Sequence, residues 1–300
     1  MNSRMPACLN HAVDRLSNEQ LKDVLFRVDT NGFPADLEAV WTVEQGRFRE
    51  TLRRIPPPHG PRAALLDLGS SRAWLPFFQI VLGYRRIVLN TCYPESGFVS
   101  EVLPVRGAER ADVRMSVFDV ERDSFPHEDE SFDVVLCLEV LEHLVVDPMG
   151  MMAEVNRVLK PGGIFVLTTP NAVRTANLVN ALLGQHPLGW APYNGFDTNR
   201  HNREYTPAEI AHLCRAAGLE PSDVLTFGAK NRGPVRRLLK WLFIPLLLSM
   251  RNCPLRWRND VILAVGRKVS GVVDRRPSWL YFDMAERAIQ TRPTIGAGSG

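Results

Sequence analysis

SFDVVLCLEVLEHLVVDPMGMMAEVNRVLKPGGIFVLTTPN, residues 131–171 of a 300-residue chain, is the stretch that decides the fold. Two apolar runs rich in β-branched residues, 132–138 and 164–169, are typical of strands buried on both faces. Between them, Asp147 as N-cap and Pro148 at the first helical position predict the start of a helix. A strand, a helix and a strand joined by short turns form a parallel βαβ unit. We therefore expect a doubly wound α/β core, with ligands bound beyond the carboxyl ends of its strands.

The rest of the chain continues this pattern. Lys-Pro-Gly-Gly at 160–163 is expected to end the first helix. Thr206 and Glu209 predict a second helix that begins with a capping box and ends at Gly218. Further strands are expected at 63–68, 86–89, 113–118, 223–227 and 260–265.

The motifs of this core resemble those of a known family. SFDVVLCLEVLEHL, LKPGG and LTTPN are similar to the later motifs of class I S-adenosylmethionine (SAM)-dependent methyltransferases, above all the branch with the quinone-biosynthesis enzymes. The resemblance covers 63–227 and 260–268. It implies an α/β, doubly wound Rossmann-like sheet of seven strands, mostly parallel with an antiparallel last strand. It also implies SAM as cofactor and methyl transfer as the reaction.

Composition and the positions of helix-breaking residues suggest how the chain is divided into domains. We expect an N-terminal helical extension and linker at 1–60, the methyltransferase domain at 61–268 and a tail at 269–300. The five cysteines form no CxxC pair, which favours a reduced, cytoplasmic setting, and the start of the chain lacks the apolar run of a secretory signal. No cluster of carboxylate and histidine residues at ligand spacing is visible, so no metal is expected.

The resemblance places the cofactor at the ends of the first strands. Gly69 is the only glycine kept in a turn where the family usually has two or three. Asn90 stands where the family normally carries an acid that binds both ribose hydroxyls; the amide keeps one acceptor and loses about 1–2 kcal/mol of charge-assisted bonding. If Asn90 faces the ribose, its replacement by aspartate should raise the affinity for SAM. The other cofactor contacts that the resemblance implies are Asp67, Ser70 and Ser71 in the first turn, Asp119 and Val120 at the adenine, and Cys137, Leu138 and Glu139 at the methionine part.

Two residues just beyond the fourth expected strand are candidates for catalysis. His143 exchanges a proton near neutral pH and is the candidate base, while Glu142 would orient it. A Glu-His pair at this place can instead cap and pack a helix start. An amine or thiolate acceptor would need no base.

The segment 184–205 is rich in Gly, Pro, Asn and aromatic residues, and family members place substrate lids at this point. The alternative for its polar side chains is a solvent-exposed loop. The candidate substrate contacts are Trp190, Tyr193, His201, Arg203 and Tyr205.

A basic and apolar insertion, 229–258, separates the last two expected strands. Its apolar run is too short to cross a bilayer, and the flanking Lys, Arg and Trp residues of 236–258 suit a helix on an anionic membrane surface. A helical lid over the core is the alternative. The localisation expected is cytoplasmic, with a peripheral contact on the inner face of the membrane left open. No nucleic-acid motif accompanies the charge, and the oligomeric state is open.

We therefore interpret the chain as a SAM-dependent methyltransferase acting on a small-molecule, sugar or lipid-linked acceptor. A non-catalytic SAM-fold binding module is the alternative, supported by the lone Gly69 and by Asn90. A nicotinamide oxidoreductase is disfavoured, because it needs the glycine fingerprint together with the acid that is replaced here.

Overall fold

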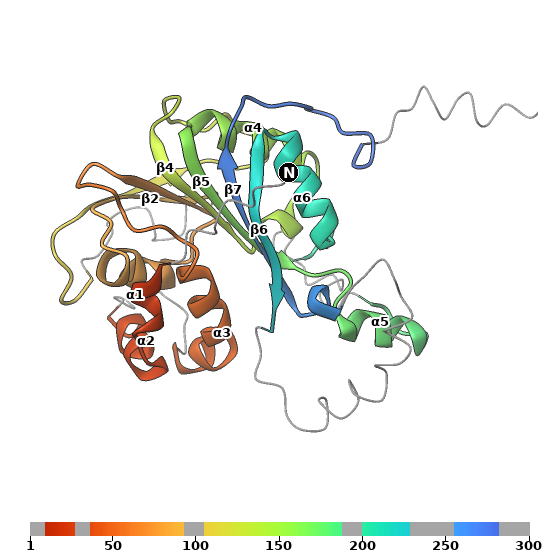
Figure 1. Ribbon diagram of the computed structural model, residues 1–300, viewed down its shortest axis with the longest axis horizontal. Helices are drawn as coiled ribbons and strands as arrows, with labels where there is room; N and C mark the ends of the chain where they lie inside the picture. Colours follow the sequence, from red (N-terminus) through yellow and green to blue (C-terminus); the bar gives the residue numbers. More distant parts are fainter. Residues whose placement is uncertain (1–9, 28–36, 93–104, 188–199, 229–254, 282–300) are drawn as a thin grey trace, which may run out of the picture.

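One seven-stranded sheet forms the centre of the protein (Figure 1). The structure, a computed structural model, describes residues 10–27, 37–92, 105–187, 200–228 and 255–281. The strand order is β3-β2-β1-β4-β5-β7-β6; the pairs from β3 to β5 are parallel, and β7 is antiparallel to both β5 and β6. This confirms the doubly wound, mostly parallel sheet with an antiparallel last strand. The strands are β1 (Ala64–Leu68), β2 (Arg86–Thr91), β3 (Asp112–Val117), β4 (Phe132–Leu138), β5 (Leu159–Pro170), β6 (Leu219–Phe227) and β7 (Val261–Lys268).

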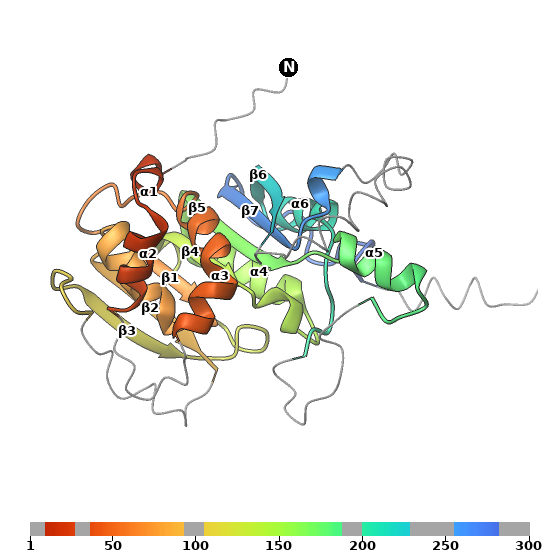
Figure 2. The same ribbon diagram turned by 90° about the horizontal axis from the view of Figure 1, so that it is seen from below.

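Helices cover both faces of the sheet (Figures 1 and 2). One face packs against the N-terminal helices and the short turns that follow β1, and the other packs against α4 and α6. Leu21, Phe48 and Leu52 from the N-terminal helices are fully or almost fully buried in the first of these cores, so these helices share a core with the sheet. The boundary at residue 60 stays a prediction. The helices are α1 (His11–Asp14), α2 (Asn18–Leu25), α3 (Leu37–Leu52), α4 (Pro148–Val158), α5 (Thr175–Leu182) and α6 (Pro207–Ala216), with short turns η1 (Arg72–Trp74), η2 (Phe77–Val81), η3 (Leu141–His143) and η5 (Leu255–Trp257).

The local signals at helix ends are confirmed. The Asp147 carboxylate accepts hydrogen bonds from the N–H groups of Met149 and Gly150, and Pro148 is the first residue of α4. Thr206 and Glu209 form the capping box of α6. Gly218 follows the α6 cap with φ +76°, and a Cβ there would lie 2.2 Å from the Gly271 carbonyl oxygen, so the chain can pass only because this residue is glycine.

Several strands are longer than the sequence predicts. β5 begins at Leu159 rather than Ile164, because Leu159 already pairs with Phe132 before a shift of register carries Lys-Pro-Gly-Gly into the strand. The helix α4 accordingly ends at Val158. The pairing of β6 with β7 runs from Phe227 opposite Val261 to Leu219 opposite Lys268, which extends both strands beyond the predicted ends. In the described part of the chain, no helix is long and apolar enough to span a membrane.

Candidate active site

The turn after β1 is shaped by a single glycine. Gly69 has φ +57°, and a Cβ on it would lie 2.6 Å from Cγ2 of Val140, in the segment that follows β4. Its N–H donates to the Asn90 side-chain oxygen at 3.0 Å, and the Ser70 hydroxyl donates to Asp67 at 2.6 Å. The turn therefore passes close over the end of β4, and the short helical turn η1 begins directly after Ser71.

Asn90 closes this turn instead of facing outward. The residue is only 1% exposed. Its Oδ1 accepts a hydrogen bond from the Gly69 N–H. Its Nδ2 donates to the Phe118 carbonyl at 3.0 Å and also lies 3.3 and 3.4 Å from the Ser116 and Thr91 carbonyls. These contacts disagree with the expectation that the amide faces a ribose, because both ends of the amide already bind backbone groups at the ends of β1, β2 and β3. The sequence could not indicate this, since the partners are distant in the chain.

Replacing Asn90 with aspartate is therefore expected to destabilise the fold rather than to raise SAM affinity. A carboxylate would keep the bond from Gly69 but would place a charged oxygen against the Phe118 carbonyl, at a cost of about 2–4 kcal/mol. Urea denaturation of the two proteins measures the loss. Asn18→Asp is the matched control, since this exposed amide oxygen accepts from Arg49 and a carboxylate would accept in the same way. Unchanged stability with tighter SAM binding would restore the ribose role.

Asp67 is a buried carboxyl at the same edge. It is 1% exposed, and burial raises its pKa to about 7, although the Ser70 hydroxyl and the nearby Arg47 guanidinium lower it. A carboxyl that gives up hydration in this way is poised to receive a cationic group. The family role predicted for Asp67 is consistent with this environment.

The other predicted cofactor residues differ in burial: those of β4 are buried, and those after β3 are partly exposed. Cys137 and Leu138 are buried in β4, and Glu139, with φ +59°, turns the chain out of that strand. Burial raises the pKa of the Glu139 carboxyl. Asp119 accepts from the Glu121 N–H at 2.9 Å and so closes the turn after β3, while its side chain stays 41% exposed. The roles of Asp119 and the half-buried Val120 at the adenine stay predictions.

Arg47 is a site residue that the sequence did not indicate. It comes from α3, donates to Glu44 at 2.6 Å and lies over the Trp74 ring at 6.0 Å. Burial lowers its pKa, but Glu139, Glu44 and Glu142 together raise it by more, so the net direction is upward. The helix α3 therefore brings a cation to a site otherwise lined by carboxyls. Among the many arginines of the N-terminal segment, no local pattern marks this one.

Glu142, His143 and His201 come together beyond β4. One possible ligand atom from each lies within 4.8 Å of the others, so the structure contradicts the premise from which no metal was expected. His143 Nδ1 is 3.1 Å from the Arg200 carbonyl oxygen, and the two imidazole rings meet edge to face with centroids 5.2 Å apart. Burial lowers the pKa of His143. The segment that carries His201 is tied to η3 because Asn202 donates from its backbone to the Glu142 carbonyl oxygen.

Other residues of the predicted substrate loop make contacts within the protein. Tyr205 is 2% exposed and packs in the core beside α6, which contradicts the expected substrate contact. Arg203 binds Glu209 of α6 at 2.8 Å and lies over the Tyr205 ring, so it fastens the loop to that helix. Trp190 and Tyr193, and residues 229–254 of the basic insertion, lie outside the described residues.

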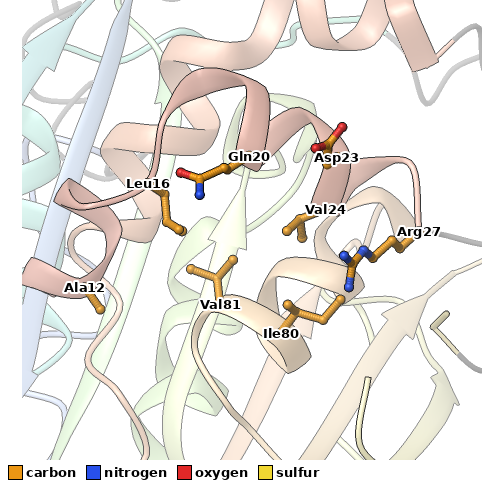
Figure 3. Close-up of a pocket in the computed structure, with 8 residues that line it drawn as sticks. All are labelled: Ala12, Leu16, Gln20, Asp23, Val24, Arg27, Ile80 and Val81. Carbon is orange, nitrogen blue, oxygen red and sulfur yellow. The ribbon is translucent and has the colours of Figure 1, made fainter. Parts of the chain in front are cut away.

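A pocket of about 340 Å³ opens elsewhere, between α1, α2 and η2 (Figure 3). Leu16, Val24, Ile80 and Val81 supply apolar side chains to it, and Gln20, Asp23 and Arg27 lie at its polar side. None of the predicted site residues lines it, so it does not belong to the candidate active site.

Comparison with known proteins decides the family. A family model described as a methyltransferase domain matches residues 40–224. The chain is a class I SAM-dependent methyltransferase. The ubiquinone biosynthesis O-methyltransferase of Roseobacter denitrificans is 32% identical over 193 residues, which are 63% of this chain and 72% of that protein. The enzyme of the same name from Idiomarina loihiensis is 40% identical over 90 residues, 30% of this chain and 35% of its own length. Thus the coverage of these relatives ranges from about a third to nearly three quarters of their length.

A solved structure supports the fold of this methyltransferase. A chain of the complex between the Haloferax volcanii Trm112 methyltransferase activator and a methyltransferase superposes with TM-score 0.51 at 17% identity, covering 84% of this chain and 98% of that one. SAM is the cofactor of the family. The residues predicted to hold it include the buried Asp67 and Gly69, and their role in binding SAM stays a prediction.

Proposed function

We propose that this methyltransferase transfers the methyl group of SAM to a hydroxyl oxygen on a small ring compound, of the class that quinone biosynthesis uses, free or carried on a lipid. The observation that carries the proposal is the His143–His201–Glu142 cluster, in which two residues that follow β4 meet one that precedes α6. The relatives' names supply the oxygen acceptor and the quinone class. Lipid-linked sugars are the second acceptor class.

The chemistry needs an activated oxygen in line with the sulfonium methyl. The Arg200 carbonyl can only accept a hydrogen bond, so we assign the proton of His143 to Nδ1 and the lone pair to Nε2. The lowered pKa keeps this ring neutral near pH 7. An acceptor hydroxyl beside Nε2 would lose its proton, and its oxygen would bond to the methyl carbon. The carbon–sulfur bond would break with its electron pair on sulfur, leaving S-adenosylhomocysteine.

The alternative of a non-catalytic module rested on the lone Gly69 and on Asn90, which form one hydrogen-bonded turn. The match to the methyltransferase family model favours the enzyme over this alternative. The proposal also includes a contact of 236–258 with an anionic membrane surface or with the lipid part of the acceptor, because the basic and apolar side chains of that segment suit both.

The test combines binding and turnover on the full chain. Calorimetry with SAM and S-adenosylhomocysteine should show micromolar or tighter binding, and labelled SAM should methylate a hydroxyl of dihydroxybenzoate-type rings with or without a prenyl tail. His143→Asn should lower turnover about 100-fold or more and leave SAM binding unchanged. His59→Asn is the matched control, since His59 is an exposed histidine beside Asp133. Methylation at carbon or nitrogen, or SAM binding with no hydroxyl acceptor methylated, would contradict the proposal.

A further inference from the structure

One short segment holds His143 by both its backbone and its ring. The segment is 200–205, which precedes α6 and forms the end of the predicted substrate loop, whereas His143 is the last residue of η3. Arg200 and His143 are 57 residues apart in the chain, so only the fold brings the two segments together. The groups that hold His143 can therefore control where its ring points.

Asn202 fastens the backbone of η3. Its N–H donates to the Glu142 carbonyl oxygen at 2.8 Å, and its side-chain Nδ2 donates to the His143 carbonyl oxygen, also at 2.8 Å. Two consecutive carbonyl groups thus receive hydrogen bonds from one residue. Any residue except proline could make the first of these bonds, but the second depends on the amide side chain.

The amide is itself oriented by Arg200. The Asn202 Oδ1 accepts from Arg200 Nε at 3.1 Å and from Arg200 Nη2 at 2.7 Å. A guanidinium can only donate hydrogen bonds, so the amide oxygen must face it and the amide nitrogen must face η3. The contact with Arg200 therefore fixes which end of the amide meets the His143 carbonyl.

The ring of His143 is held by the same segment. Its Nδ1 lies 3.1 Å from the Arg200 carbonyl oxygen. The contacts form a closed cycle: the Arg200 carbonyl binds the ring, the Arg200 guanidinium orients the Asn202 amide, and that amide binds the His143 carbonyl. The bond to the ring keeps its length and direction only while η3 and the segment 200–205 keep their spacing.

We propose that Asn202 is a positioning residue for His143. The amide keeps η3 at the spacing at which Nδ1 of the ring bonds the Arg200 carbonyl, and this leaves Nε2 as the nitrogen with the lone pair. An error of about 1 Å in the placement of a reacting group can slow a transfer roughly 100-fold. The effect on methyl transfer rests on the proposed function, in which Nε2 takes the acceptor proton, whereas the hold on the ring does not.

Nitrogen NMR of the full chain with ¹⁵N-labelled histidine, without SAM or acceptor, tests the hold on the ring. At pH 8 an imidazole is mostly neutral, so its two tautomers can be distinguished. In the parent, His143 should carry its proton on Nδ1, and His143→Asn identifies its signals by their loss. Asn202→Ala should give a mixture of both tautomers at His143, while the exposed His59 should be the same in both proteins.

Steady-state kinetics measures the catalytic effect. Asn202→Ala should lower kcat about 10–100-fold and leave the affinity for SAM unchanged. Asn202→Asp keeps an acceptor for Arg200 but loses the donor to the His143 carbonyl, so it should be as slow as the alanine variant. It also carries the test if the alanine variant does not fold.

Asn18→Ala is the matched control. The Asn18 oxygen accepts from Nε and Nη2 of Arg49 at 3.1 and 2.8 Å, so the variant removes the same kind of amide–arginine contact from an exposed position. It should leave kcat and the His143 tautomer as in the parent.

Three results would overturn the proposal: a parent tautomer and kcat in Asn202→Ala, full activity of Asn202→Asp, or a loss of kcat that merely follows losses of urea stability and SAM affinity. A changed tautomer in Asn202→Ala, with no hydroxyl methylated by the parent, would support the positioning role and contradict only the proposed function.

Discussion

Replacement of Asp67 by asparagine is expected to weaken SAM binding about 100-fold and, in the cofactor-free protein, to raise stability at pH 8. The carboxyl is 1% exposed and its pKa is raised to about 7, mainly by burial. SAM carries a sulfonium and an ammonium group, and a buried charge–charge contact with them is worth a few kcal/mol. The asparagine oxygen can still accept from Ser70, so the turn should keep its shape.

The pH dependence follows from the direction of this shift. Because the folded pKa is above the unfolded value of 3.8, the folded state holds the proton more tightly. The stabilisation from this carboxyl is complete below about pH 4 and is lost as the pH rises through 7. Asparagine does not titrate, so it has no such loss. The free energy of unfolding of the variant should therefore exceed that of the parent by up to roughly 4 kcal/mol at pH 8 and by much less at pH 5.

Urea denaturation at pH 5 and pH 8, with calorimetry for SAM, measures both effects. Asp129→Asn is the matched control, because that carboxylate is 75% exposed and lies in the loop before β4, away from the predicted cofactor residues. We expect it to leave the difference between the two pH values as in the parent. Equal stability curves for Asp67→Asn and the parent would show that Asp67 is not under the strain that its burial implies.

Replacement of Arg47 by methionine is expected to cost about 3–5 kcal/mol of stability and to abolish tight SAM binding. The side chain is 16% exposed and is the cation among Glu44, Glu139 and Glu142, with Asp67 also in its field. Methionine keeps the apolar contact with Trp74 but leaves buried carboxyls without a counter-charge. The affected carboxyls would bind protons or draw in water, and the edge at which SAM is predicted to bind would change.

The measurement is urea denaturation at pH 7.5, followed by SAM titration of the folded variant. Arg47→Lys should recover part of the stability, since it returns the charge without the planar fork. Arg114→Met is the matched control: it breaks an exposed pair with Asp112 and should cost less than about 1 kcal/mol. A loss for Arg47→Met no larger than this control would mean that the carboxyls do not depend on the α3 cation.

The sequence alone determined the structural features that depend on residues close together in the chain. The Asp147-Pro148 start of α4, the Thr206–Glu209 capping box and the left-handed backbone of Gly218 after α6 depend on atoms within a few residues of one another, and all are confirmed. The apolar run at 132–138 is a strand with the predicted ends, because its apolar side chains favour burial on both faces of the sheet. The motifs around it were enough to indicate the family.

Only the tertiary structure decided what depends on contacts between distant segments. The length of β5 depends on pairing with β4, and the role of Asn90 depends on carbonyls of β3. The same holds for Arg47 beside the β4 end and for His201 beside His143. Side-chain type limits what a residue can bind, but hydrogen bonds and charge pairs act over a few ångströms, and those distances exist only after the chain has folded.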